Sequence, residues 1–225
     1  MKKSIIFGNT SFSKMLKYYI EKYMNIEIVA FCVDSRYITN PFLDNIPVIP
    51  FETIESFYPS DSFDFFIGIG NNLMNTVREK KFFEISNKGY RILNFIHPSA
   101  TIESANIGSG NIILENVSIG YNTQIGNGNI LWNNVTLSHE DSIGNFNYLA
   151  PACALAGRVT IKNNCFLGIN CTLKNDLTIG SYTLIGAGCY IKRSTKENSV
   201  YISDNSIYLE EKNSLDFCSG KSTSL

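Results

Sequence analysis

A fixed spacing of six residues dominates the hydrophobic pattern of the second half of the chain. Beginning at Ile107, every sixth position is Ile or Leu for fifteen successive positions, ending at Ile191. This period fits neither an α-helix nor a simple hairpin sheet, but it is typical of a parallel β-helix in which each hexad is one short strand and one turn. Three hexads would then form one triangular coil, with a large aliphatic side chain inside each face.

Two further positions of the hexad support this interpretation. The residue after the aliphatic is often Gly, and glycine and asparagine would supply the tight turns, where φ > 0 is accessible to them. Four residues after the aliphatic, most side chains are small, and four of the six cysteines occupy this position: Cys153, Cys165, Cys171 and Cys189. We interpret them as small buried hydrophobic residues. Coils stacked at about 4.8 Å would give a prism of about five coils, roughly 24 Å tall.

The first hundred residues follow a different pattern. SIIFG, EIVAFCVD and FDFFIGIG predict strands, SKMLKYYIEKYM and NLMNTVREKKFFEISNKG predict helices, NPFLDNIPVIP is expected in a loop, and YRILNFI predicts a last strand. This alternation favours a small parallel α/β unit, Rossmann-like in layout. We therefore expect three segments: an α/β domain at 1–96, a β-helix at 97–200 and a polar, Ser-rich tail at 201–225.

Composition excludes several classes of protein. The net charge is −1 with 17% charged residues, so no nucleic-acid partner and no binding to anionic membranes are expected. No apolar run approaches the roughly 20 residues of a membrane span. The segment MKKSIIFGNTSFSK resembles a first strand more than a signal peptide, so we expect a cytoplasmic protein. Six cysteines without a C-x-x-C pair and only two histidines make a zinc site improbable, and no metal is expected.

The layout of the whole chain, and above all the stretch SHEDSIGNFNYLAPACALAGRVTIKNNCFLGINCTL, resembles the NeuD/PglD-type sugar acetyltransferases. These belong to the hexapeptide-repeat acyltransferases, which fold as left-handed β-helices. The resemblance implies an enzyme that transfers acetyl from acetyl-CoA to a small-molecule sugar or sugar-nucleotide. It also implies a homotrimer whose active sites lie between neighbouring subunits.

His139 is the candidate catalytic base. It follows Leu137 by two positions, so it lies on the turn side of its hexad and faces outwards. Imidazole ordinarily has a pKa of about 6.5, which suits removal of a proton from an attacking amine or hydroxyl at neutral pH. The resemblance assigns this role to His139, and to Glu140 the role of accepting a hydrogen bond from the other ring nitrogen.

The resemblance also assigns the acetyl-CoA contacts. Gly157 matches a glycine whose amide binds the thioester carbonyl, although a plain turn residue is the alternative. Ile169 aligns with a backbone contact to the pantetheine arm, and backbone groups of later coils such as Ala187 would hold the rest. Lys192 could meet the phosphates, the alternative being a solvated side chain. Tyr148 stands where the family has a second histidine, and it can form a hydrogen bond without sharing the proton load at pH 7.

A sugar-nucleotide site is expected in the first domain. The loop after the first strand keeps Gly8, and the start of the following helix could bind phosphate through its amides with help from Thr10 and Ser11. The family's histidine in this loop is replaced by a phenylalanine. Asp34, at the end of the second strand, matches an acid that contacts base or ribose. Asn71, in GIGNN, lies in another loop expected to line the pocket.

Three functions remain in competition at this point. The first is acetyl-CoA-dependent N-acetylation of a nucleotide-linked amino-deoxy sugar, such as a 4-amino-4,6-dideoxyhexose, for surface glycan synthesis. The second, motivated by the altered nucleotide loop, is O-acetylation of a sialic acid or capsule-type sugar hydroxyl. The third is a non-catalytic prism or a zinc enzyme of the carbonic-anhydrase type, which two histidines cannot supply with ligands. His97 is expected to be structural.

Overall fold

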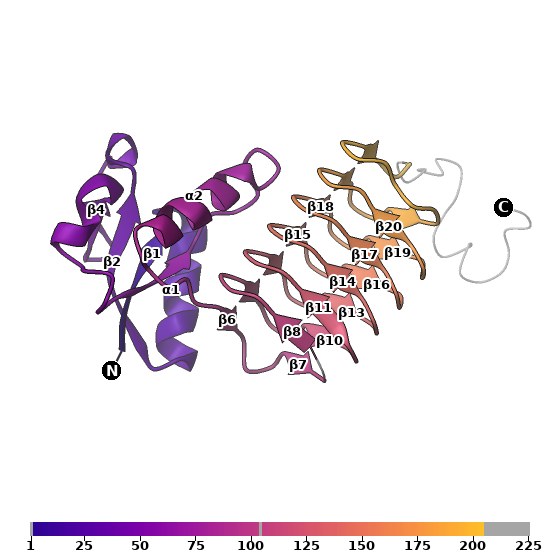
Figure 1. Ribbon diagram of the computed structural model, residues 1–225, viewed down its shortest axis with the longest axis horizontal. Helices are drawn as coiled ribbons and strands as arrows, with labels where there is room; N and C mark the ends of the chain where they lie inside the picture. The colour runs from indigo at the N-terminus through magenta and orange to yellow at the C-terminus, as the bar shows by residue number, and fades with distance from the viewer. Residues whose placement is uncertain (1, 104, 205–225) are drawn as a thin grey trace, which may run out of the picture.

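A sheet flanked by two helices is followed by a three-sided column of short strands in the computed structural model, which describes residues 2–103 and 105–204 (Figure 1). Most of the predicted tail, residues 205–225, lies outside the described residues. No helix among the described residues is long and apolar enough to cross a membrane.

The first unit contains five strands, two α-helices and two short 3₁₀ helices. Their bounds are β1 Lys2–Phe7, α1 Ser11–Tyr23, β2 Ile26–Val33, η1 Ser35–Tyr37, β3 Phe42–Leu43, β4 Ile46–Pro50, η2 Phe51–Ser56, β5 Asp64–Ile67 and α2 Thr76–Asn87. Its sheet has the order β3-β4-β2-β1-β5, parallel except for the β3–β4 pair. The parallel α/β unit expected from the sequence is therefore present.

Two sequence predictions in this unit were wrong in detail. The segment 40–50 is not a loop but a hairpin, because Asp44 and Asn45 both adopt φ > 0 and turn β3 back onto β4. The segment 90–96 is not a strand of this sheet. Only Ile92 bridges to Phe65, and β6 at Phe95–Ile96 already pairs with the column.

The column is a parallel β-helix built from three sheets. Most strands pair in parallel with the strand 18 residues further along, as Ser118 does with Thr136 and Leu137 with Leu155. The offset is shorter only at the two ends, as where Phe95 pairs with Ile112 and Leu184 with Val200. One coil is therefore three hexads, as the six-residue spacing predicted. The strands are β6 Phe95–Ile96, β7 Thr101–Ile102, β8 Ala105–Ile107, β9 Ile112–Ile113, β10 Ser118–Ile119, β11 Thr123–Ile125, β12 Ile130–Leu131, β13 Thr136–Leu137, β14 Ser142–Ile143, β15 Tyr148–Leu149, β16 Ala154–Leu155, β17 Thr160–Ile161, β18 Phe166–Leu167, β19 Thr172–Leu173, β20 Thr178–Ile179, β21 Leu184–Ile185, β22 Tyr190–Ile191 and β23 Val200–Tyr201.

The inside of the column is filled by the aliphatic residues and by the small residues four positions later. Both sets belong to one buried cluster, which includes the four cysteines assigned to the small position. The thiols of Cys153 and Cys171, one coil apart, lie 3.5 Å from each other. The interpretation of these cysteines as buried packing residues is confirmed.

The turns differ from the expectation in one respect. Left-handed backbone recurs every sixth residue, but at the position before the small residue, and it is adopted by residues as large as Phe146 and Tyr182. The glycines that follow the aliphatics are needed for another reason, because a β-carbon there would meet the next coil. At Gly120 it would lie 1.4 Å from the carbonyl oxygen of Ser138. Close stacking, not φ > 0, selects glycine at this position.

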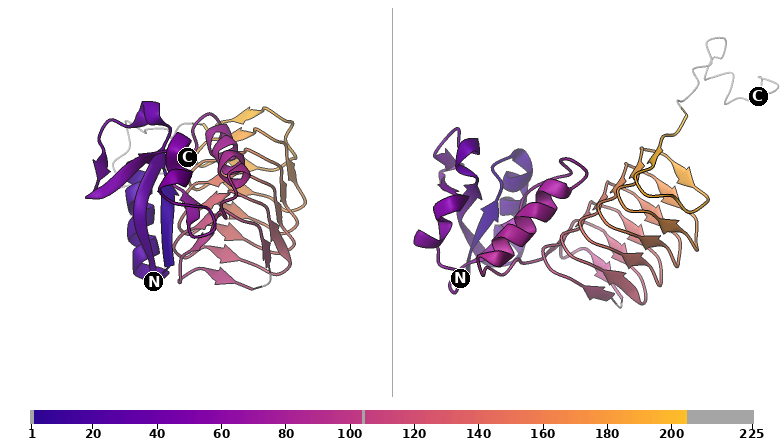
Figure 2. Two further views of the ribbon diagram at one scale, coloured as in Figure 1. Left: turned by 60° about the vertical axis from the view of Figure 1, so that its left-hand side comes forward. Right: turned by 45° about the horizontal axis from the view of Figure 1, so that its top comes forward.

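The first unit packs on the column through α1, α2 and the loop before α2 (Figure 2). Arg78 of α2 is fully buried and donates to the backbone carbonyls of Gly128, Phe146 and Asn147 in the column. It also donates to Gly70 in the loop after β5. One side chain therefore ties that loop to the first coils of the column.

Candidate active site

His139 lies at the corner of the column where the sheet of β13 passes into the sheet of β14. Residues 18 apart share a corner position, so Tyr121 lies one coil before His139 and Gly157 one coil after it. The turn is attached to both neighbours: the Glu140 amide donates to the Tyr121 carbonyl at 2.8 Å, and the Arg158 amide donates to the His139 carbonyl at 2.9 Å. The backbone beneath the imidazole is therefore fixed by the coils on either side.

The imidazole and the adjacent carboxylate form a pair on the outside of this corner. The Nδ1 atom of His139 lies 3.2 Å from Oε2 of Glu140, and the side chains are 49% and 47% exposed. Glu140 has φ = 56°, a left-handed turn conformation that L side chains adopt at a cost of roughly 1–2 kcal/mol. A carboxylate on Nδ1 holds that nitrogen protonated, so Nε2 is the nitrogen available to accept a proton.

Gly157 provides the space into which Nε2 projects. A β-carbon at residue 157 would lie 2.3 Å from Nε2 and 2.4 Å from Cε1 of His139. Gly157 is not among the residues with left-handed φ, so a turn conformation does not explain the glycine. Among the described residues no acceptor takes up its amide. Nε2 of His139 therefore lies against the open backbone of Gly157, whose amide has no acceptor among the described residues.

An ion pair that the sequence reasoning missed lies beside this point. Arg158 and Asp176 are one coil apart and bind through two contacts, Nε–Oδ1 at 2.6 Å and Nη2–Oδ2 at 3.1 Å. The pair raises the pKa of Arg158 and lowers the pKa of Asp176. Glu140, Arg158 and Asp176 occupy successive coils of one corner position, and Asp176 binds the guanidinium of Arg158. Writing the sequence in rows of 18 residues, one coil to a row, would have placed these three residues of alternating charge above one another.

The residues predicted to bind acetyl-CoA lie on later coils. Ile169 is 56% exposed, and its carbonyl accepts from the Gly188 amide at 2.9 Å. The carbonyl of Ala187 accepts from the Ser203 hydroxyl at 2.8 Å. Ile169 and Ala187 lie at the corner from which the strands β19 and β22 begin. These strands belong to the same sheet as β13, and His139 lies at the corner where the strands of that sheet end. Lys192 lies at the corner of His139, three coils later, with Nζ 5.5 Å from the Tyr190 ring centroid.

Tyr148 is not brought to His139 within one chain. It lies on the outer face of the sheet opposite that corner, where its ring stacks on Phe166 with a centroid separation of 5.3 Å. Trp132 packs on its other side. Burial raises the pKa of the Tyr148 hydroxyl.

The residues predicted for the sugar-nucleotide gather at one end of the first sheet. Strands β1 and β5 are adjacent and parallel, so the loops holding Gly8 and Asn71 leave the sheet side by side. A β-carbon on Gly8 would lie 2.7 Å from the carbonyl oxygen of Gly68, so the glycine permits this close approach. Thr10 is the N-cap of α1 and Ser11 begins it, and both are exposed.

Asp34 reaches the same end of the sheet but is already paired. Its Oδ1 lies 2.5 Å from Nζ of Lys81, a buried lysine that also binds Glu84 at 2.5 Å. The ring of the Phe12 that replaces the family's histidine lies 5.7 Å from the Trp132 ring. This loop therefore packs an aromatic side chain onto the column, and Lys81, which binds Asp34, is neutralised by two carboxylates.

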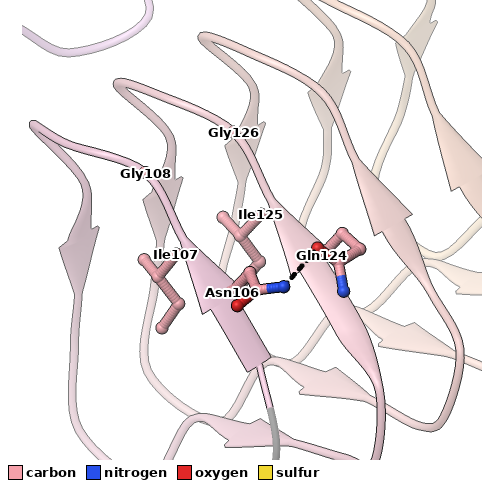
Figure 3. A pocket seen from close by; sticks show the side chains of 6 residues that line it. All are labelled: Asn106, Ile107, Gly108, Gln124, Ile125 and Gly126. Atoms are coloured by element: carbon pink, nitrogen blue, oxygen red, sulfur yellow. Dashed lines mark hydrogen bonds between the residues drawn. The ribbon is translucent and has the colours of Figure 1, made fainter.

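Two other features of the surface lie away from the corner. A shallow recess is lined by Asn106, Ile107, Gly108, Gln124, Ile125 and Gly126, on the first coils of the neighbouring sheet (Figure 3). Asn106 donates to Gln124 there at 3.0 Å, and none of the lining side chains is titratable. No group of three or more His, Cys, Asp or Glu side chains within 2–103 and 105–204 is arranged to hold a metal ion.

Comparisons with known proteins agree with this architecture. Residues 3–85 match the model of the PglD N-terminal domain, and residues 158–193 match the bacterial transferase hexapeptide model of six repeats. A search of curated protein sequences gives no match.

Several solved structures share the fold over most of the chain. The acetyltransferase domain of PglB from Neisseria gonorrhoeae FA1090 is 21% identical, with a TM-score of 0.78, 89% of this chain covered and 96% of that chain. PerB from Caulobacter crescentus, in complex with CoA and GDP-perosamine, is 24% identical, with a TM-score of 0.79 and coverage of 89% and 93%. WeeI from Acinetobacter baumannii AYE is 19% identical, with a TM-score of 0.76 and coverage of 89% and 96%.

These similarities describe the column as a left-handed β-helix preceded by a Rossmann-like unit. The two family models match in the order that the sequence analysis expected, the first on the α/β unit and the second on the coils that follow His139. The chain therefore combines a match to the PglD N-terminal domain, at residues 3–85, with a match to the bacterial transferase hexapeptide repeats, at residues 158–193, which is the arrangement that the resemblance to NeuD/PglD-type acyltransferases predicts.

Proposed function

We propose that the protein is an acetyl-CoA-dependent N-acetyltransferase acting on a nucleotide-linked amino-deoxy sugar, with His139 as its general base. The observation that carries this proposal is the meeting of the His139 Nε2 atom with the open backbone of Gly157, while Glu140 holds Nδ1. The known complex of PerB with CoA and GDP-perosamine supports the choice of substrates.

The reaction follows from these three residues. The sugar amine attacks the thioester carbonyl of acetyl-CoA, and Nε2 of His139 takes the proton that the nitrogen must lose. The Gly157 amide donates to the carbonyl oxygen as negative charge develops on it. The C–S bond then breaks, and the imidazolium returns the proton to the departing thiolate. Glu140 stabilises the imidazolium between these two transfers.

The substrates would approach the corner from two directions. Acetyl-CoA would lie along the later coils, past Ile169 and Ala187, with Lys192 near its phosphates. The sugar-nucleotide would be held by Gly8, Thr10, Ser11, Asp34 and Asn71 at the end of the first sheet. That end and the His139 corner lie on different sides of the column, so the acceptor bound by one subunit would be acetylated at the corner of its neighbour.

A homotrimer is therefore part of the proposal, with catalysis lost on dissociation. Tyr148, which lies opposite the corner in its own chain, could approach the corner of a neighbour in such an assembly. Light scattering should give three times the chain mass of 25.2 kDa. An active monomer would refute the shared site. With acetyl-CoA as donor, we place the reaction in the cytoplasm.

Thiol release from acetyl-CoA tests the activity directly. Release should require an amino-sugar nucleotide, chosen by mass spectrometry from UDP-, dTDP- and GDP-linked candidates. The substitution His139→Ala should reduce kcat about 10²–10⁴-fold, the usual contribution of a general base, while the melting temperature stays unchanged. A reduction of less than about tenfold would count against His139 as the base.

O-acetylation of a sugar hydroxyl is the second candidate. The packing of Phe12 on Trp132 and the pairing of Lys81 with Asp34 and Glu84 favour it, because they leave fewer free donors for a nucleotide's phosphates. Paired acceptors that differ only in an amine or a hydroxyl discriminate the two. A strong preference for the hydroxyl would exclude N-acetylation.

A further inference from the structure

Asp141 is a buried acid at the corner that carries His139. Its side chain occupies the small position four residues after Leu137 and is 1% exposed. The other described residues at this position are neutral: Asn111, Val117, Thr123, Asn129, Val135, Asn147, Cys153, Val159, Cys165, Cys171, Leu177, Thr183, Cys189 and Thr195. A charged side chain at one such position, and at this corner, calls for an explanation.

Both carboxylate oxygens of Asp141 accept from backbone amides. Oδ1 accepts from the Val159 amide of the next coil at 2.8 Å, and Oδ2 accepts from the Ser138 amide of its own turn at 2.9 Å. The first bond joins two coils. The second closes the turn on the residue that precedes His139, so both ends of the segment 138–141 are tied together.

Three asparagines occupy this small position elsewhere in the β-helix, and they show which hydrogen bonds a side-chain amide forms there. The Oδ1 atoms of Asn111 and Asn129 accept from the amide one coil further at 2.8 Å, and Asn147 does the same for Cys165. Their Nδ2 atoms donate to carbonyls 15 residues along the chain, all at 2.9 Å. An asparagine at 141 could therefore keep the bond to Val159, but its NH₂ group cannot accept from Ser138.

We propose that Asp141 is a positioning residue, which holds the turn of His139 through its second hydrogen bond and so keeps the imidazole against Gly157 and Glu140. The proposal rests on the function proposed above, in which His139 is the base. Burial raises the pKa of Asp141 to about 6, against the opposing effect of the two amides. Keeping Asp141 ionised therefore lowers the stability of the folded state. The neighbouring coils have the uncharged residues Thr123 and Val159 at this position.

Two substitutions and one control test this role. Asp141→Asn should fold, because three asparagines occupy the same position in this chain, and it removes only the acceptor for Ser138. Asp141→Val copies Val159 and removes both bonds. The control is Thr123→Val, at the same position one coil before, where the hydroxyl is buried with no partner.

We expect kcat to fall at least tenfold in Asp141→Asn and further in Asp141→Val, with both KM values within threefold of wild type and melting temperatures equal or higher. The control should keep its kcat. The chain has two histidines, so ring NMR signals resolve His139 from His97. In both Asp141 variants the His139 signals should shift or broaden while those of His97 stay in place.

A kcat within twofold of wild type in Asp141→Asn, with unchanged His139 signals, overturns the proposal. So does a fall in kcat that is matched by a fall in melting temperature without a change at His139, since that result describes a structural role. If the wild-type protein transfers no acetyl group, the proposed function fails, and the NMR comparison alone decides whether Asp141 positions the ring.

Discussion

The imidazole of His139 occupies the volume that a side chain at residue 157 would need. The two residues share one corner position in successive coils, and Nε2 lies 2.3 Å from the point where a β-carbon on Gly157 would stand. The consequences can be measured through the substitutions below.

Gly157→Ala should abolish most of the activity. The added methyl group must displace the imidazole, which separates Nε2 from the Gly157 amide and disturbs the contact with Glu140. We expect kcat to fall at least a hundredfold, because misplacement by about 1 Å can cost that much. The backbone conformation of Gly157 is accessible to alanine, so the melting temperature should change little. Full activity in this variant would mean that the ring does not work in the observed orientation.

Replacing Glu140 should separate the effect of its charge from that of its hydrogen bond. Glu140→Gln retains an acceptor for Nδ1 and should lose about tenfold in kcat, whereas Glu140→Ala should lose about a hundredfold, both within the range of general base catalysis. The comparison is made at saturating substrate. Equal rates in wild type and Glu140→Ala would remove Glu140 from the mechanism.

Asp176→Asn should weaken catalysis indirectly. Loss of the bidentate contact frees Arg158, whose guanidinium can then turn towards Glu140 and compete with His139 for the carboxylate. We expect a two- to fivefold fall in kcat, restored when Arg158→Gln is added. A double-mutant cycle over Arg158 and Asp176 measures this coupling. Additive effects would show that Arg158 does not reach Glu140.

Arg78→Met should destabilise the protein by about 3–5 kcal/mol, as expected when a buried charged donor is removed and several carbonyls lose their partner. Burial lowers the pKa of Arg78, and its bonds to the carbonyls of Gly128, Phe146 and Asn147 compensate for this cost. Urea unfolding gives the measurement. The control Lys3→Met, an exposed lysine whose Nζ lies 4.0 Å from the partly exposed Glu27 carboxylate, should lose less than about 1 kcal/mol.

Stability should fall as pH rises through the titration of Asp141. Its pKa is about 6 in the folded protein, above the ordinary value of 3.8, so the folded state binds the proton more tightly than the unfolded state. The resulting stabilisation is complete below about pH 4 and is lost as pH rises through 6, a difference of about 3 kcal/mol. Urea midpoints between pH 4 and 7 should show this loss in wild type but not in Asp141→Asn. The same dependence of the urea midpoint on pH in wild type and in Asp141→Asn would contradict this prediction.

The sequence predicted the column well because its signal is local and repeated. Each Ile or Leu of the ladder reports one buried position, and the spacing determines the coil without any long-range information. The hairpin at 40–50 was missed because its turn depends on two residues, Asp44 and Asn45, in a conformation that a short apolar segment between prolines did not indicate. Helix α2 was expected at 72–89, but its first residues form the bend at Asn75, with φ = 67°.

The candidate site was only partly predictable. His139, Glu140 and Gly157 were proposed from a motif, and the predicted coil length stacks residue 157 on residue 139. The direction in which the His139 ring points depends on side-chain packing that neither the motif nor the spacing contains. The bond of Asp141 to Val159 and the ion pair of Arg158 with Asp176 join residues 18 apart in the chain, and the bond of Asp141 to Ser138 depends on the conformation of its own turn. Tyr148 was placed by its sequence distance from His139, yet half a turn of the column puts it on the opposite face.

Strict stacking also limits how this protein can change in length. In the middle of the β-helix each strand pairs with a strand one full turn of 18 residues further on, so an insertion or deletion of another size would rotate all later residues onto different faces. Ile169, Ala187 and Lys192 would then no longer flank the sheet that leads to the His139 corner. Homologues with longer or shorter columns should therefore differ by whole turns, with loops projecting only at the corners.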